Sequence, residues 1–80
     1  MRNRYLEITF RNGKPLAAYL YLPRQGADTS ARTVRCEEGL LIDFAADGRA
    51  IGIEITVPSK VSLEAVNRAL AGVHQKPVMA

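Results

Sequence analysis

The sequence has one cysteine, one histidine and no tryptophan in its 80 residues. A lone cysteine leaves no disulfide within the chain. Cys36 and His74 together also fall short of a structural zinc site, which takes about four cysteine or histidine ligands. Domains this small usually rely on a disulfide, a metal or a partner subunit. We therefore expect this single domain, residues 1–80, to associate with another chain, and a homodimer is the simplest form.

Long apolar runs and blocks of charge are missing as well. No apolar run approaches the roughly 18 residues of a membrane span, and the N-terminal MRNRYLEITF has no signal-peptide core. The net charge of +3 comes from eleven Lys and Arg against eight Asp and Glu, spread along the chain. A dedicated nucleic-acid binder usually gathers its basic residues in a patch or stripe. We expect a cytoplasmic protein that does not contact the membrane.

The most strongly patterned stretch is residues 39–57, GLLIDFAADGRAIGIEITV. It predicts a β-hairpin in which Asp47 and Gly48 form a two-residue type I′ turn, with positive φ at both positions. That turn creates three apolar pairs: Phe44 with Ile51, Ile42 with Ile53, and Leu40 with Ile55. The pairs form an apolar strip on one face, and a slip by one residue would set polar side chains against it.

A second hairpin is predicted at the start of the chain. Residues 4–11 alternate between apolar and polar side chains, as a half-buried strand does. Gly13 marks a turn, and residues 16–22 return as the second strand. A two-residue loop would set Phe10 opposite Pro15, so we favour a three-residue loop over residues 12–14. Its pairs are Phe10 with Leu16, Ile8 with Ala18, and Leu6 with Leu20, all on the core face.

The middle of the chain predicts a loop and a short third strand. Residues 23–31, PRQGADTSA, have loop composition and are long enough to let the next strand join the sheet elsewhere. Residues 32–36 form that strand. A three-residue loop over 37–39, with Gly39 in the left-handed region, pairs Cys36 with Leu40 and buries the cysteine.

A helix is predicted after the sheet. Ser62 is a suitable N-cap, and Gly72 is a suitable C-terminal stop. Four apolar side chains share one side of this helix: Leu63, Val66, Leu70 and Val73. Residues 74–80 are predicted to be a mobile tail. The predicted fold class is α+β, a twisted antiparallel sheet of about five strands with one C-terminal helix packed on its apolar face.

Two surfaces are candidate sites. Tyr5, Tyr19 and Tyr21 lie on the face away from the apolar strip, and we interpret them as a protein interface because tyrosine is enriched at contacts. The alternative is a weak nucleic-acid site in which the tyrosines stack bases. Its phosphate contacts would come from Arg2, Arg4, Arg35 and Lys60.

The second candidate is a polar cluster of Arg35, Asp43 and Glu54. Paired carboxylates can hold a cation or move a proton, but no nucleophile or histidine joins them. We therefore interpret the cluster as a polar lattice in which Arg35 neutralises the carboxylates, and we predict no catalytic, cofactor or metal site. Gly52, opposite Asp43, indicates a close approach by a ligand, a second subunit or a side chain such as Tyr19.

The hairpin motif DGRAIGIEI, with AAYLYL upstream and SKVSLEAVNRAL downstream, resembles a small bacterial family called domain of unknown function 2283. The family's D-G-hydrophobic-hydrophobic-G-I-E-I pattern is matched by Asp47, Gly48, Ala50, Ile51, Gly52, Ile53, Glu54 and Ile55. The family's upstream strand often carries an acidic residue that is absent here. The resemblance implies no established catalytic residues, and some members of the family are suspected to be small antitoxin-like partners of toxin-like proteins.

Overall fold

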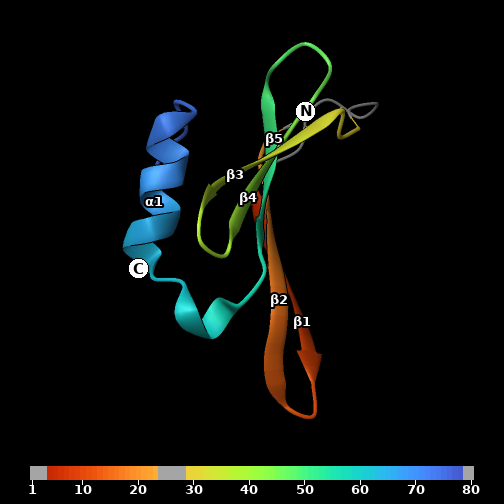
Figure 1. The fold of residues 1–80 in the computed structure, drawn as a ribbon, viewed down its shortest axis with the longest axis vertical. Helices are drawn as coiled ribbons and strands as arrows, with labels where there is room; N and C mark the ends of the chain where they lie inside the picture. The colour runs from red at the N-terminus through yellow and green to blue at the C-terminus, as the bar shows by residue number, and fades with distance from the viewer. Residues whose placement is uncertain (1–3, 24–28, 79–80) are drawn as a thin grey trace.

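The described part of the chain forms an antiparallel sheet with an α-helix on one of its faces (Figure 1). The structure, a computed structural model, describes residues 4–23 and 29–78. Within them the elements are β1 (Tyr5–Arg11), β2 (Lys14–Tyr21), β3 (Arg32–Glu37), β4 (Leu40–Phe44), β5 (Ala50–Ile55), the 3₁₀ helix η1 (Pro58–Lys60) and α1 (Leu63–Gly72). The predicted α+β class, with five strands and a C-terminal helix, is confirmed.

The strand order is β1-β2-β5-β4-β3, so β1 and β3 are the two edges. β2 pairs with β5, which sets Tyr21 opposite Gly52 and Leu20 opposite Ile53. The connection predicted at residues 23–31 therefore leads from β2 to the far edge of the sheet. Its residues 24–28 lie outside the described part of the chain.

The β4–β5 hairpin confirms the predicted register over most of its length. Leu40 lies opposite Ile55 and Ile42 opposite Ile53. The prediction is wrong next to the turn, where Phe44 lies opposite Ala50 and Ile51 is the extra residue of a β-bulge.

The type I′ turn predicted for this hairpin is also wrong. Gly48 has a φ of +93°, but among the described residues Asn12 and His74 alone carry a side chain at positive φ, so Asp47 does not. The carboxylate of Asp47 instead accepts hydrogen bonds from the backbone N–H of Arg49 (3.1 Å) and from its Nε (2.6 Å). A hydrogen bond from the backbone to a nearby aspartate side chain competes with the backbone hydrogen bonds of a tight two-residue turn.

The β1–β2 hairpin combines the two alternatives drawn from the sequence. Asn12 and Gly13 have φ values of 53° and 76°, so they form a two-residue turn between Arg11 and Lys14, and the predicted three-residue loop is wrong. A bulge at Leu16 then restores the predicted pairs of Leu6 with Leu20 and Ile8 with Ala18. Phe10 does lie opposite Pro15, as expected of a two-residue loop, and the extra residue Leu16 brings the following residues back into the predicted register.

The β3–β4 hairpin differs from prediction in the same way. Gly39 has the predicted left-handed φ, +82°, but Glu37 rather than Cys36 lies opposite Leu40. Cys36 is the bulged residue and is exposed, so its predicted burial is wrong. Its Sγ lies 3.6 Å from the Leu40 carbonyl oxygen. Partial desolvation raises the pKa of the Cys36 thiol even so, which favours the neutral form.

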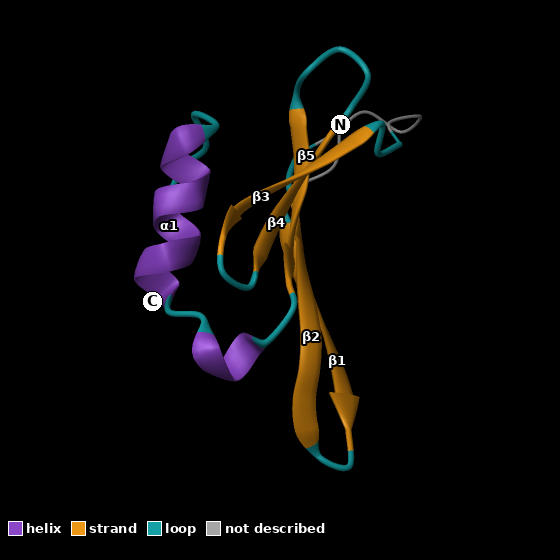
Figure 2. Ribbon diagram, in the orientation of Figure 1, coloured by secondary structure: helices purple, strands orange, loops and turns teal. Residues whose placement is uncertain are grey.

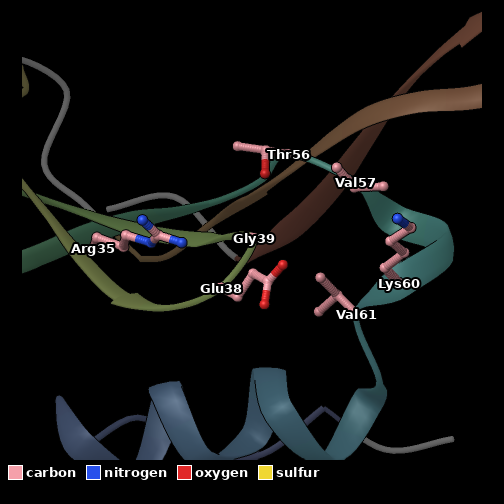
Figure 3. A pocket seen from close by; sticks show the side chains of 7 residues that line it. All are labelled: Arg35, Glu38, Gly39, Thr56, Val57, Lys60 and Val61. Carbon is pink, nitrogen blue, oxygen red and sulfur yellow. The ribbon is translucent and has the colours of Figure 1, made fainter.

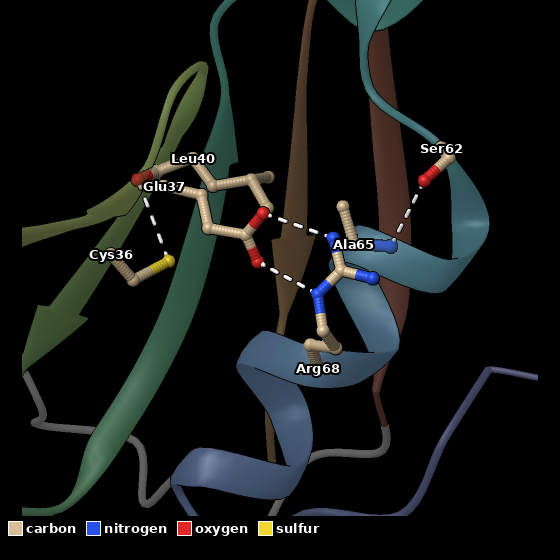
Figure 4. Close-up of polar contacts among 6 residues, drawn as sticks. All are labelled: Cys36, Glu37, Leu40, Ser62, Ala65 and Arg68. Carbon is tan, nitrogen blue, oxygen red and sulfur yellow. Dashed lines mark hydrogen bonds and ion pairs between the residues drawn. The ribbon is translucent and has the colours of Figure 1, made fainter.

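The helix begins and ends where the sequence predicts. Ser62 Oγ accepts a hydrogen bond from the N–H of Ala65, as an N-cap does (Figure 4). Arg68 makes a two-pronged contact with Glu37, which ties the helix to the β3–β4 turn and raises the pKa of the arginine. Leu63 is 41% exposed, so its predicted place on the buried face is wrong. The buried helical residues are Ala65, Val66, Ala69 and Leu70.

The core lies between the helix and the middle of the sheet (Figure 2). Its buried strand residues are Ala18, Leu20, Leu40, Ile42, Ile53 and Ile55, and Leu22, directly after β2, joins them. α1 contacts β3 and β4, and η1 contacts β2, so no helix covers β1. In residues 4–23 and 29–78, no helix has the length and apolarity that crossing a bilayer demands.

The segment after the helix folds back onto it. The N–H of Val78 donates to Asn67 Oδ1 (2.7 Å), and Asn67 Nδ2 donates to the Val78 carbonyl (3.3 Å). Arg4 also donates to the carbonyls of Lys76 and Pro77. The mobility predicted for residues 74–80 stays a prediction, and residues 79–80 lie outside the described residues.

Replacing Asn67 with alanine should release this segment. Both hydrogen bonds to Val78 would be lost, so the Val78 amide should exchange with solvent at least about tenfold faster while the amides inside α1 keep their rates. Arg68→Ala is the matched control, because its side chain contacts Glu37 and not the tail. Amide exchange followed by NMR reports both. Fast exchange of Val78 in the unaltered protein would contradict docking and bear out a mobile tail.

Candidate interaction site

The three candidate tyrosines lie together on the sheet face opposite the helix. Tyr5 is opposite Tyr21 in the β1–β2 pair, and their rings stack with centroids 4.4 Å apart and planes 14° apart. The Tyr19 ring meets Tyr21 at 4.6 Å with a tilt of 54°. Tyr5 is 46% exposed, whereas Tyr19 and Tyr21 are half-buried. The strand period predicted this group.

Carboxylates surround these rings. Tyr19 OH donates to Asp43 Oδ2 at 2.6 Å, and Tyr21 OH donates to Glu7 Oε1 at 3.3 Å. Glu54 lies directly opposite Tyr19. Negative charge beside the aromatic rings repels phosphate. Base stacking on this face stays a prediction, and these carboxylates oppose it.

Arg4 and Arg2 are two of the four cations predicted to contact phosphate. Arg4 donates to backbone carbonyls of the C-terminal segment, so its guanidinium already has a role. Arg2 lies outside the described residues. The arginine part of the nucleic-acid alternative therefore gains no support from the observed contacts.

Gly52 leaves room for the ring of Tyr19. A Cβ at position 52 would overlap the Tyr19 ring and hydroxyl. Of the three explanations for this glycine, a neighbouring side chain is the one the structure shows. Because Asp43 is directly opposite Gly52, the glycine also allows the tyrosine hydroxyl to reach the carboxylate.

The predicted polar cluster is only partly assembled. Asp43 accepts hydrogen bonds from Tyr19 and from Thr33 Oγ1, which is opposite it on β3. Arg35 on β3 and Glu54 on β5 both lie opposite Leu41, so the strand β4 separates them. That spacing is about 10 Å. Tyr19 and Thr33, rather than Arg35, therefore satisfy the carboxylate of Asp43.

Arg35 contributes instead to a hollow of about 500 Å³ beside the β3–β4 turn (Figure 3). The Glu38 carboxylate projects between Arg35 and Lys60 in this hollow. Its remaining lining residues are Gly39, Thr56, Val57 and Val61. The residues that line the hollow include neither a histidine nor a cysteine.

A different surface was not anticipated from the sequence. Leu6, Ile8 and Phe10 on β1 are 52%, 42% and 60% exposed. Leu6 and Ile8 are opposite the core residues Leu20 and Ala18, so these side chains lie on the helix side of the sheet. We call Leu6, Ile8 and Phe10 the hairpin patch. The sequence predicts that they face the core, and their exposure shows that this prediction is wrong.

The size of the helix explains why the hairpin patch is uncovered. A helix is about 10 Å across with its side chains, and strands are about 4.8 Å apart. One helix therefore covers two or three of the five strands, and α1 lies toward β3 and β4. The β1–β2 hairpin projects past the helical layer (Figure 1). One short helix in the sequence therefore implies that some strands stay uncovered, and the placement of α1 decides which strands these are.

A protein-family model, "Protein of unknown function (DUF2283)", matches residues 17–56. These residues are half of the chain. The chain belongs to this family. No curated protein and no solved structure gives a significant match.

The DUF2283 match has a clear structural meaning. It runs from inside β2 to the end of β5, so it covers the four strands β2, β3, β4 and β5 and the contact between Tyr19 and Gly52. β1, with the hairpin patch, and α1 lie outside it. The DUF2283 segment is thus the four-stranded part of the sheet, and β1 and α1 of this chain flank it.

Proposed function

We propose that this DUF2283 protein is a non-enzymatic protein-interaction module of the cytoplasm that associates with a second copy of itself. The observation that supports this most is the hairpin patch, three large apolar side chains in a row on an edge strand. Exposed apolar groups of this kind mark interaction sites. Unpaired strand edges invite a further strand.

The chemistry of the chain favours the same proposal. Among residues 4–23 and 29–78, no three His, Cys, Asp or Glu side chains come close enough to hold a metal ion together. The one thiol has a raised pKa, which makes it a poor nucleophile. A toxin-like protein as an additional partner stays a prediction that rests on the family.

The oligomeric state tests the proposal. We expect a dimer at micromolar concentration in sedimentation equilibrium, and Phe10→Glu should weaken it at least about tenfold, because a charge would replace the most exposed apolar side chain of the hairpin patch. Phe10 is 60% exposed, so this change should leave the monomer folded. Val34→Glu, at a 37% exposed site on the other edge strand, is the matched control and should not change the association. A wild-type monomer, or equal weakening by both variants, would refute the proposal.

A further inference from the structure

The two edges of the sheet differ in how well they are protected. β3 carries a bulge at Cys36, and helix α1 packs beside it. Arg32 and Arg35 also lie on β3. Bulges, basic side chains and covering helices are the devices that keep an edge from pairing. β1 has seven regular residues, Tyr5–Arg11, without a bulge of its own. Only β1, of the two edges described, is ready to accept another strand.

The turn determines which backbone groups of β1 are free. Arg11 and Lys14 flank a two-residue turn, so they form a hydrogen-bonded pair. Such pairs alternate along an antiparallel ladder. The N–H and C=O groups of Tyr5, Glu7 and Thr9 therefore point to β2. Those of Leu6, Ile8 and Phe10 point to the open edge, so the residues of the hairpin patch also carry the unused backbone groups.

Given the self-association proposed above, we propose that two copies pair β1 with β1 in antiparallel fashion, with Ile8 on the twofold axis. The two five-stranded sheets then become one continuous sheet. The axis is perpendicular to the sheet, so both helices and both hairpin patches lie on the same face. A second copy is the occupant because this strand is complementary to itself.

The sequence of β1, YLEITFR, shows this complementarity. With Ile8 on the axis, Leu6 is opposite the partner's Phe10, and Ile8 is opposite the partner's Ile8. Apolar cross-strand pairs of this kind stabilise a sheet. On the other face Tyr5 is opposite the partner's Arg11, a cation–π pair, and Glu7 is opposite the partner's Thr9. No two like charges are opposed.

Neighbouring registers are worse. An axis at Glu7 sets that carboxylate against its own copy, which is destabilising. An axis at Thr9 extends the ladder to Asn12, whose φ of 53° ends the strand. An axis between two residues would pair edge-facing with inward-facing backbone groups and place the two hairpin patches on opposite faces. Ile8 is the position that pairs the whole of β1.

Amide hydrogen exchange tests the edge pairing without any label. In the dimer, the amides of Leu6, Ile8 and Phe10 should be protected from exchange. Because position 10 differs in the Phe10→Glu monomer, the comparison uses Leu6 and Ile8, whose amides should exchange at least about tenfold more slowly in the dimer. The amides of Glu7 and Thr9 bond to β2 in both states and are the internal control. A dimer in which Leu6 and Ile8 exchange as in the monomer would overturn the edge pairing but leave the self-association standing. A wild-type monomer would overturn both.

Disulfide trapping tests the register. In a Cys36→Ser background, Ile8→Cys places two thiols on the axis with Cα atoms about 5.5 Å apart, within the range of a disulfide. Leu6→Cys is the control, because its two copies are about 13 Å apart along the strand pair. We expect air oxidation to give a covalent dimer from Ile8→Cys and not from Leu6→Cys. Cross-linking through Leu6→Cys alone would overturn the register.

Discussion

Leu70→Ala should lower the free energy of unfolding by about 3 kcal/mol. Leu70 has no exposed surface, and it lies in the cluster that joins α1 to the buried strand residues. α1 is the one α-helix in the described part of the chain, so the cavity would open in the middle of the contact between the two layers. Small domains have a total stability of only about 5 to 10 kcal/mol. Urea denaturation followed by circular dichroism would measure the loss.

The matched control for this change is on the same helix. Leu63 is the first residue of α1 and is 41% exposed. Leu63→Ala removes the same atoms and should cost less than about 1 kcal/mol, since much of that side chain is already hydrated. Equal losses for the two variants would mean that the helix does not pack on the sheet through the side of Leu70.

Gly52→Ala should destabilise the protein by about 3 kcal/mol although it adds a single methyl group. The new Cβ would occupy the space of the Tyr19 ring, and overpacking of this kind costs about 1 to 3 kcal/mol. The ring would have to move, so its 2.6 Å hydrogen bond to Asp43 would be lost as well. A hydrogen bond to a charged acceptor contributes about 1.5 to 3 kcal/mol. Chemical denaturation measures the sum.

A double-mutant cycle separates this clash from an effect on the strand itself. In a Tyr19→Ala background the space above Gly52 is empty, so Gly52→Ala should become neutral or stabilise by about 0.5 kcal/mol, since alanine is less costly than glycine within a strand. Thr33→Ala also removes a hydrogen bond to Asp43 but leaves Tyr19 in place, so Gly52→Ala should stay damaging there. If Gly52→Ala costs as much in the Tyr19→Ala background as in the wild type, the contact with Tyr19 is not the cause.

The sequence predicts the strands and the pairs in the middle of each hairpin, because alternation with a period of two fixes which side chains share a face. It fails next to all three hairpin turns. Each hairpin has one extra residue there, at Leu16, Cys36 or Ile51. All three are apolar, so the pattern does not show that the alternation skips at these positions. Local backbone geometry decides where the β-bulge forms, as in the turn where Asp47 accepts hydrogen bonds from Arg49.

The candidate sites also divide into features that follow from strand register and features that depend on long-range contacts. The tyrosine group and the contact of Tyr19 with Gly52 follow from register, and the sequence contains both. The placement of the helix depends on long-range contacts, such as that of Arg68 with Glu37, which no local pattern encodes. Without that placement, Leu6, Ile8 and Phe10 look like core residues. Only the folded arrangement distinguishes a buried apolar strip from an exposed one.

The pairing of β2 with β5 also has a consequence for how the chain acquires its fold. β1–β2 and β3–β4–β5 are each built from neighbouring segments, and such local hairpins form within microseconds. The β2–β5 ladder joins Tyr21 to Gly52 and must first close the long intervening stretch, which has a high entropic cost. We expect this closure to limit the rate of folding. Until it occurs, a newly made chain would present β2 and β5 as two further open edges. The nascent protein must therefore form the β2–β5 ladder before it meets another copy, because open edges pair with other chains.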